Sequence, residues 1–309
     1  MRYRPLGNTG MAISAVSLSL TDSNARRAND WIALVYAGLE SGINAFEVAG
    51  CHPFLIDGFG QAIKAVDRNL LFIAWRLGWV VTASGAMARD FSAESLTATV
   101  EAALARTGLE YLDAGILDEP AAAELAPQAL EAMKQLKEAG RIRMLGVSGG
   151  DDATDTYIST GAFDVLATTF NLLSGWKERL RLKAAIDRDM AVIGFGYYPT
   201  IQRDRSPGSK PTLWGRAAHP LEGAGSYLFL DETPKWTAEE LCLGYAMTEP
   251  SLCTVQIVPD RVERIEQLAA VAERELPSNV PAQIEMARFS PTSRPAAADV
   301  ALDRRRQAS

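Results

Sequence analysis

The stretch "LKEAGRIRMLGVSG", residues 136–149, predicts the end of a helix, a turn and a buried strand in immediate succession. Apolar residues recur at helical spacing over 128–139 and indicate one face of a helix. Gly140 stands where that helix ends, and the apolar run 143–149 follows it. A helix that leads through a short turn into a buried strand is the repeating unit of α/β proteins.

Other segments along the chain have the same apolar, β-branched character as 143–149. With it they make eight predicted strands: 15–20, 43–49, 70–77, 112–118, 143–149, 163–171, 190–197 and 253–258. Helical patterns lie between them, for example 92–107 behind a capping residue at Ser92, and a capping box runs from Thr237 to Glu240. Strands that alternate with helices in this number predict a parallel (β/α)8 TIM barrel.

The segment before the first strand predicts a β-hairpin that turns at Asn8-Thr9-Gly10 and closes the bottom of the barrel. A doubly wound sheet is the competing fold, but it requires a G-x-G-x-x-G phosphate turn after an early strand. No predicted strand is followed by that motif. We therefore predict one barrel domain over 1–286, followed by an Ala-, Arg- and Pro-rich tail over 287–309.

The composition limits the kinds of partner that we expect and the cellular compartment. A net charge of −7 argues against nucleic acid, because binding to its backbone needs a basic surface. The apolar runs are too short to span a membrane, and the first residues lack the apolar core of a signal peptide. Three cysteines without metal or disulfide spacing favour a reduced, cytoplasmic setting. We expect a small-molecule substrate; the oligomeric state stays open.

Polar residues gather where the predicted strands end, which is where β/α barrels carry their chemistry. Glu47, Arg76 and Asp118 come from three successive strands, so we expect them to meet at one rim. The long Pro- and Gly-containing stretch 199–236 follows the seventh strand, and a loop of this length is usually functional. The candidate site residues, in chain order, are Glu47, His52, Trp75, Arg76, Asp118, Glu119, Ser148, Asn171 and Arg261.

With these segments in place, the chain resembles the aldo-keto reductase family. "YRPLGNTGMAISAVSLSL" (3–20) is similar to that family's opening hairpin and first strand, and "LKEAGRIRMLGVSG" to its helix, turn and strand ending in Gly-Val-Ser. "FNLLS" (170–174) and "TVQIVPDRVERIEQLAAV" (254–271) resemble its sixth-strand segment and its last strand and cofactor-contacting helix. The resemblance implies NADPH-dependent carbonyl reduction by a tetrad of aspartate, tyrosine, lysine and histidine.

Carried over position by position, the tetrad is fully substituted. Glu47 stands at the aspartate position and His52 at the tyrosine position, with the spacing of five residues kept. Arg76 stands at the lysine position and Asp118 at the histidine position. The resemblance therefore implies the fold more strongly than the usual reaction.

The cofactor positions implied by the resemblance are partly retained. Ser148 and Asn171 match residues that hold the carboxamide of the nicotinamide, and Arg261 matches one that meets a 2′-phosphate. Gly149 and Ala167 replace an expected asparagine and glutamine. The cofactor is therefore unknown, and NADPH stays possible at an eroded site.

The four replacements are all ionisable, which favours a repurposed polar site over one that has merely decayed. An arginine can clamp an anion, and a histidine suits acid-base work at neutral pH. Glu47 would pair with Arg76, and Asp118 would orient His52 or act as a second base. We predict non-redox chemistry of the lyase, dehydratase or isomerase type on a small anionic or carbonyl substrate.

Two alternatives stay open. The first is an NADPH-dependent carbonyl oxidoreductase with His52 as an atypical proton donor, and the second is a non-catalytic ligand- or partner-binding protein. In each reading Trp75 and Glu119 would line the pocket. We expect no metal, because Arg76 beside the carboxylates opposes a cation. A nucleophilic role for Cys51, next to His52, is the less favoured reading.

Overall fold

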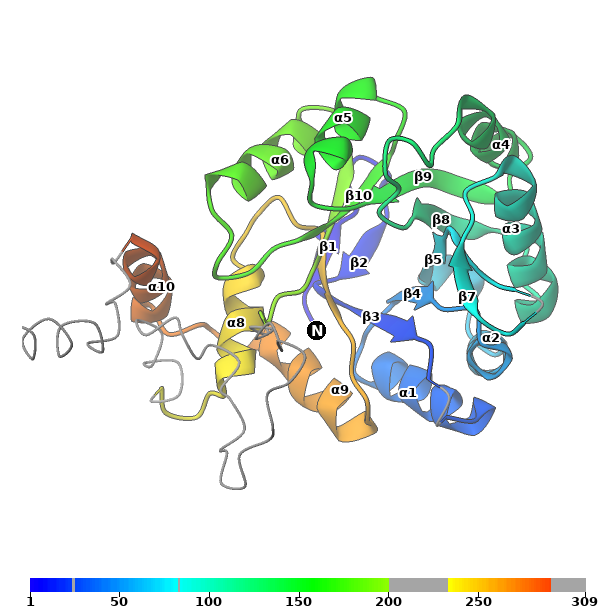
Figure 1. Cartoon of the computed structure of the whole chain (residues 1–309). Helices are drawn as coiled ribbons and strands as arrows, with labels where there is room; N and C mark the ends of the chain where they lie inside the picture. The colour runs from blue at the N-terminus through cyan, green and yellow to red at the C-terminus, as the bar shows by residue number, and fades with distance from the viewer. Residues whose placement is uncertain (24–25, 83, 200–232, 290–309) are drawn as a thin grey trace, which may run out of the picture.

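The chain folds into a closed barrel of eight parallel strands surrounded by helices (Figure 1). This computed structural model describes residues 1–23, 26–82, 84–199 and 233–289. The barrel order is β10-β11-β12-β3-β4-β5-β8-β9. Its strands are β3 (Val16–Thr21), β4 (Ala45–Ala49), β5 (Phe72–Leu77), β8 (Leu112–Leu117), β9 (Ile142–Ser148), β10 (Val165–Thr169), β11 (Ala191–Phe195) and β12 (Thr254–Ile257). The predicted TIM barrel is confirmed, and its strand bounds differ from the predicted ones by a few residues at most.

The predicted N-terminal hairpin is also confirmed. β1 (Tyr3–Pro5) pairs antiparallel with β2 (Ala12–Ser14). Leu6 and Ile13 are fully buried in one apolar cluster with barrel-interior residues such as Phe72. The hairpin therefore closes one end of the barrel by packing apolar side chains into it.

Helices cover the outside of the barrel, and their ends follow local rules. Ser92 accepts a hydrogen bond from the backbone of Ser95 at 3.2 Å, and Thr237 and Glu240 form the predicted capping box. The helices are α1 (Ala28–Glu40), α2 (Pro53–Ile63), α3 (Ala93–Thr107), α4 (Pro127–Glu138), α5 (Asp152–Thr160), α6 (Trp176–Ile186), α8 (Ala238–Ala246), α9 (Val262–Ala270) and α10 (Asn279–Phe289), with short 3₁₀ turns η1 (Arg68–Leu70) and η3 (Val271–Glu273). None of the helices in the described ranges is long and apolar enough to cross a membrane.

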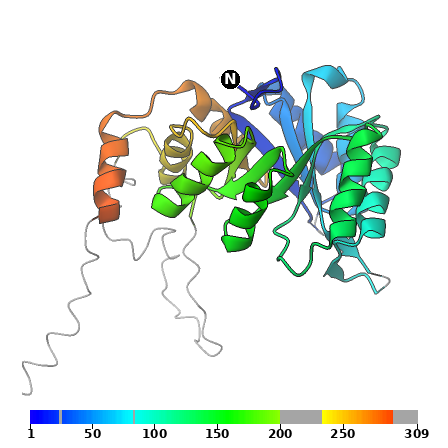
Figure 2. The same cartoon turned by 90° about the horizontal axis from the view of Figure 1, so that it is seen from above.

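Two views place α10 at the side of the barrel away from α3 and α4 (Figures 1 and 2). This helix runs through the predicted boundary between the domain and the tail at 286/287, so the boundary itself stays a prediction. Residues 200–232 of the long stretch after β11 and residues 290–309 of the tail lie outside the described residues.

A second hairpin, β6 (Trp79–Val81) with β7 (Met87–Arg89), follows β5 and was not predicted. Gly78, at φ 109°, turns the chain out of the barrel strand, and a side chain there would collide with the Phe91 ring, 2.2 Å from the position of its Cβ. The hairpin therefore leaves the barrel at the carboxyl end of β5, next to the predicted site.

Candidate active site

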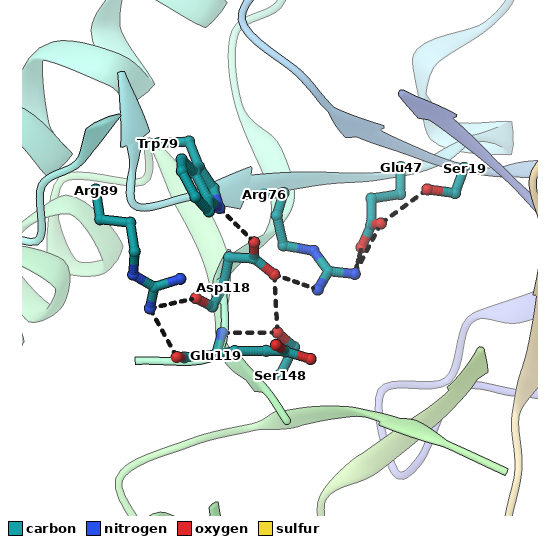
Figure 3. A network of polar contacts seen from close by, with 8 residues as sticks. All are labelled: Ser19, Glu47, Arg76, Trp79, Arg89, Asp118, Glu119 and Ser148. Atoms are coloured by element: carbon teal, nitrogen blue, oxygen red, sulfur yellow. Dashed lines mark hydrogen bonds and ion pairs between the residues drawn. The ribbon is translucent and has the colours of Figure 1, made fainter. Parts of the chain in front are cut away.

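Alternation along the strands brings the predicted polar residues onto one inner layer of the barrel. Ala45, Ala74 and Ala114 face the barrel interior, so residues two and four positions further along β4, β5 and β8 face the same way. That geometry places Glu47, Arg76 and Asp118 side by side at the carboxyl end (Figure 3). We call these three residues the rim cluster.

Arg76 and Glu47 form a buried ion pair. Both oxygens of Glu47 accept hydrogen bonds from Nη2 of Arg76, at 2.9 and 3.0 Å. Ser19, on the neighbouring strand β3, donates to Oε1 of Glu47 at 3.0 Å. Glu47 is only 1% exposed, so both of its oxygens are held by protein donors away from water.

Asp118 takes the other side of Arg76. Nη1 of Arg76 donates to Oδ1 of Asp118 at 2.8 Å, and Ser148 donates to the same oxygen at 3.2 Å. The indole N–H of Trp79 donates to Oδ2 at 2.6 Å. Donors from β5, the β6–β7 hairpin and β9 therefore fix this carboxylate, and no described residue links it to His52. The predicted role of Asp118 in orienting His52 is not met.

In the rim cluster, the charge of Arg76 is engaged by the two carboxylates beside it. Burial lowers the pKa of Arg76, but the adjacent carboxylates of Glu47 and Asp118 outweigh it and raise the pKa above its ordinary value. The guanidinium also lies over the ring of Phe195, 5.7 Å from its centroid. One cation between two carboxylates leaves a net negative charge, so Arg76 has no unpaired charge for a substrate anion.

His52 lies outside this network, at the start of α2. Its Nδ1 accepts a hydrogen bond from the backbone N–H of Phe54 at 3.2 Å, which makes His52 the N-cap of the helix. The Phe54 ring packs against the imidazole at a centroid distance of 5.3 Å. Because Nδ1 accepts, the neutral ring carries its proton on Nε2. No described residue accepts a hydrogen bond from that Nε2–H.

Cys51, beside His52, is poorly suited to act as a nucleophile. Its Sγ donates to the backbone oxygen of Trp79 at 3.2 Å. Burial, with a contribution from the carboxylate of Asp22, raises the pKa of the thiol to about 11. At neutral pH the group is a thiol that ties the β4–α2 loop to the second hairpin.

The two predicted pocket residues, Trp75 and Glu119, differ in their burial. Trp75 is 2% exposed and packs in the layer between the strands and the helices, because it alternates with the inward-facing Arg76. Contrary to the prediction, Trp75 therefore does not line the barrel interior. Glu119 is exposed at the rim with φ 47°, and its backbone N–H donates to Ser148 at 3.0 Å.

The predicted cofactor residues lie at the same end of the barrel. They differ in how many hydrogen bonds they already make within the protein. Ser148 bridges Asp118 and the backbone of Glu119. The side chain of Asn171 donates to the Gly196 oxygen and accepts from the Leu173 N–H, both at 2.9 Å. Arg261 is exposed at the N-cap of α9. In the described part of the chain, no group of three or more His, Cys, Asp or Glu residues could hold a metal ion.

Sequence reasoning missed Ser19 and the role of the β6–β7 hairpin. Arg89 on β7 stacks over Trp79 at 5.3 Å, donates to the backbone oxygen of Glu119 at 2.7 Å and pairs with Glu124 at 2.8 Å. These contacts fasten the hairpin over Asp118. The alternating segment around Ser84-Gly85 was the available signal for a hairpin, but nothing in it indicated that Trp79 bonds a carboxylate.

Comparison with known proteins supports the resemblance. The sequence model of the Aldo/keto reductase family matches residues 17–288. The chain is 24% identical over 292 residues to the NADH-specific methylglyoxal reductase of Escherichia coli (strain K12), covering 84% of this chain and 86% of that protein. It is 26% identical over 165 residues to L-galactose dehydrogenase of Arabidopsis thaliana, covering 48% and 49%.

Solved structures agree with the fold. The holo form of aldo-keto reductase AKR11C1 from Bacillus halodurans superimposes with a TM-score of 0.75 at 17% identity, covering 96% of this chain and 99% of that one. Glycerol dehydrogenase AKR11B4 from Gluconobacter oxydans gives a TM-score of 0.70 at 16% identity, covering 95% and 98%. The family match spans most of the sequence, and these structures share its barrel: the chain belongs to the aldo/keto reductase family.

Proposed function

We propose that this protein is a nicotinamide-dependent oxidoreductase that reduces a small uncharged carbonyl compound, with His52 as the proton donor. The observation that carries the proposal is the cap on α2: Nδ1 of His52 accepts from Phe54, and Nε2–H is left as a donor without an acceptor among the described residues. The relatives named above are oxidoreductases by name, which favours this reaction class over others.

A neutral imidazole can polarise a carbonyl, as the neutral histidine of triosephosphate isomerase does. In the proposed reaction Nε2–H of His52 donates a hydrogen bond to the carbonyl oxygen of the substrate. A nicotinamide cofactor, when bound, would supply the hydride that this reduction needs. The oxygen then becomes an alkoxide, which is a stronger base than imidazolate, so it takes the Nε2 proton and water later returns one to the ring.

The rim cluster sets the charge of the substrate in this proposal. Its net negative charge disfavours an anion near Arg76, because both terminal nitrogens of that guanidinium already serve Glu47 and Asp118. The predicted lyase, dehydratase or isomerase chemistry required Arg76 as a free anion clamp, so the geometry gives it no support. An uncharged carbonyl such as methylglyoxal fits the site better.

The residues present fit a dinucleotide unevenly. At the phosphate end, the exposed Arg261 stands at the N-terminus of α9, and Arg26 donates to the backbone oxygen of Asp260 beside it at 2.6 Å. At the carboxamide end, Asn171 keeps one N–H beyond its internal bond, whereas Ser148 is fully buried against Asp118 and the backbone of Glu119. Arg261 would hold a phosphate, and Asn171 would orient the nicotinamide.

The test is a titration followed by an assay. Purified protein is titrated with NADPH and with NADH while tryptophan fluorescence is recorded, and then mixed with cofactor and methylglyoxal while the reduced nicotinamide absorbance is followed. We expect saturable quenching and carbonyl-dependent loss of absorbance. Absence of quenching with both cofactors would contradict the proposal and favour a non-catalytic binding protein.

A further inference from the structure

Asp22 lies directly after β3 and holds the backbone on which His52 is mounted. Its Oδ1 accepts a hydrogen bond from the N–H of His52 at 2.8 Å, and its Oδ2 accepts from the N–H of Cys51 at 2.9 Å. Both bonds are charge-assisted, and they join the loop after β3 to residues that lie 29 and 30 positions further along the sequence. One carboxylate therefore fixes two consecutive peptide groups at the entry to α2.

The position of this carboxylate depends on Gly50. A Cβ built on Gly50 would lie 2.3 Å from Oδ1 of Asp22 and 2.8 Å from a methyl group of Leu55. Only glycine leaves room for the carboxylate to approach the backbone this closely. The β4–α2 loop is thus shaped to receive the Asp22 side chain.

The contacts of the imidazole itself are weaker than the two bonds that Asp22 makes with the backbone beside it. The cap from Phe54 to Nδ1 is 3.2 Å long and involves no charged group, and the second contact is ring packing by the same residue. Neither contact reaches back to a barrel strand. Besides the chain itself, which leaves β4 at Ala49, the bond to Asp22 ties the His52 backbone to the barrel, since Asp22 adjoins Thr21, the last residue of β3.

We propose that Asp22 is a positioning residue that holds His52 in the conformation in which Nδ1 caps α2 and Nε2–H is kept as a donor. The inference rests on the proposed function for its kinetic consequence, but its structural consequence can be measured without substrate. Removing the carboxylate frees the N–H groups of Cys51 and His52, loosens the cap and lets the imidazole sample both neutral tautomers.

Histidine ¹⁵N spectra test this directly, because the full chain contains only His52 and His219. Protein labelled with ¹⁵N-histidine is recorded by long-range ¹H–¹⁵N correlation, and a His219→Gln variant assigns the signals. We expect His52 of the wild type to show one tautomer with the proton on Nε2. In Asp22→Asn, which keeps one acceptor oxygen, and more fully in Asp22→Ala, the two ring nitrogens should converge toward a mixture.

The matched control is Asp67→Asn, which makes the same change at a carboxylate that also accepts a backbone N–H, from Asn69 at 3.0 Å, in the turn that leads into β5. It should leave the His52 signals unchanged. Wild-type His52 signals in folded Asp22→Asn and Asp22→Ala would overturn the inference. Thermal melts establish that each variant is folded.

Kinetics separate this inference from the proposed function. If the protein reduces carbonyls, Asp22→Ala should lower kcat by about tenfold to a hundredfold with little change in KM, because the donor is misplaced rather than removed. If the tautomer changes but no form of the protein turns over, the proposed function fails and the positioning role stands. If the protein turns over and Asp22→Ala keeps both its kcat and its His52 signals, only the positioning role fails.

Discussion

The two ends of β8 carry ion clusters of opposite composition. At its carboxyl end, the rim cluster holds one arginine between two carboxylates. At its start, Asp113 is 1% exposed and lies between two arginines, 2.6 Å from Arg68 and 3.6 Å from Arg143. We call Arg68, Asp113 and Arg143 the base cluster. Both clusters use the same chemical groups, so ion pairing alone does not distinguish a site from a structural contact.

The surroundings of each cluster make the difference. In the base cluster Tyr111 lies between the two guanidinium groups, 4.0 and 3.6 Å from its ring centroid, and the Ile73 N–H donates to Asp113 at 2.8 Å. Burial raises the pKa of Asp113 and outweighs the lowering by the arginines. The rim cluster lies instead at the barrel end where enzymes of this fold act, beside the β4–α2 loop that bears His52. We infer function from the free donor near the rim and not from the ion pairs.

Removal of Arg76 should have the largest effect on stability. Arg76→Met leaves two carboxylates without a cation in the barrel, so the free energy of unfolding should fall by about 3–5 kcal/mol. Arg68→Met should cost less, about 1.5–3 kcal/mol, because Asp113 keeps Arg143 and the Ile73 N–H. Urea denaturation at neutral pH measures both. An equal or larger loss in Arg68→Met would reverse the ranking of the two clusters.

Replacement of Trp79 should have an intermediate effect. Trp79→Phe keeps a ring for Arg89 to stack on but removes the N–H that donates to Asp118, and a hydrogen bond to a charged group contributes about 1.5–3 kcal/mol. Thermal and urea denaturation should both show the loss. An unchanged stability would mean that the hairpin does not hold the rim cluster.

In the base cluster, Tyr111→Phe is the matched control for Trp79→Phe. The hydroxyl of Tyr111 is buried and has no hydrogen-bond partner among the described residues, so Tyr111→Phe removes an unsatisfied group. Its stability should equal or slightly exceed that of the wild type under the conditions used for Trp79→Phe. A loss as large as that of Trp79→Phe would mean that the Tyr111 hydroxyl stabilises the fold and that the base cluster cannot serve as the control.

Loss of the exposed ion pair between Arg89 on β7 and Glu124, which we call the clamp, should have the smallest effect on stability. That effect should depend on pH. The hydrogen bond from Arg89, with the Ala121 N–H, lowers the pKa of Glu124 below its ordinary value. The stabilisation is therefore present at neutral pH and is lost as the pH falls through the lowered pKa. Hydrogen exchange over 79–89 should quicken in Glu124→Gln relative to wild type at neutral pH, after correction for intrinsic exchange rates, and this difference should shrink under acid conditions. A difference that does not depend on pH would rule out the clamp.

Much of the fold could be predicted, because the period of apolar residues and the helix caps act locally. The same alternation that faces Arg76 inward also faces Trp75 outward, so the error at Trp75 could have been avoided from strand periodicity. The pairing of Glu47 with Arg76 followed from their places on adjacent strands. These features needed only the sequence and the parallel arrangement of strands.

The remaining features depend on contacts between distant segments. Asp22 meets the backbone of His52 because β3 and β4 are neighbours and because Gly50 admits a carboxylate, which no local pattern indicates. Trp79 reaches Asp118 only because the hairpin folds back over the rim.

The role of His52 as a helix cap, by contrast, could have been predicted locally. Pro53 follows it, and proline is favoured at the first helical position.

Turnover by His52→Asn tests the central claim most directly. Asparagine is a good N-cap residue and can keep the bond from Phe54, but it has no N–H at the position of Nε2. With NADPH or NADH and methylglyoxal, the account predicts an unchanged melting temperature and a kcat at least about a hundredfold below that of the wild type. A folded His52→Asn protein whose kcat stays within about twofold of wild type would contradict it.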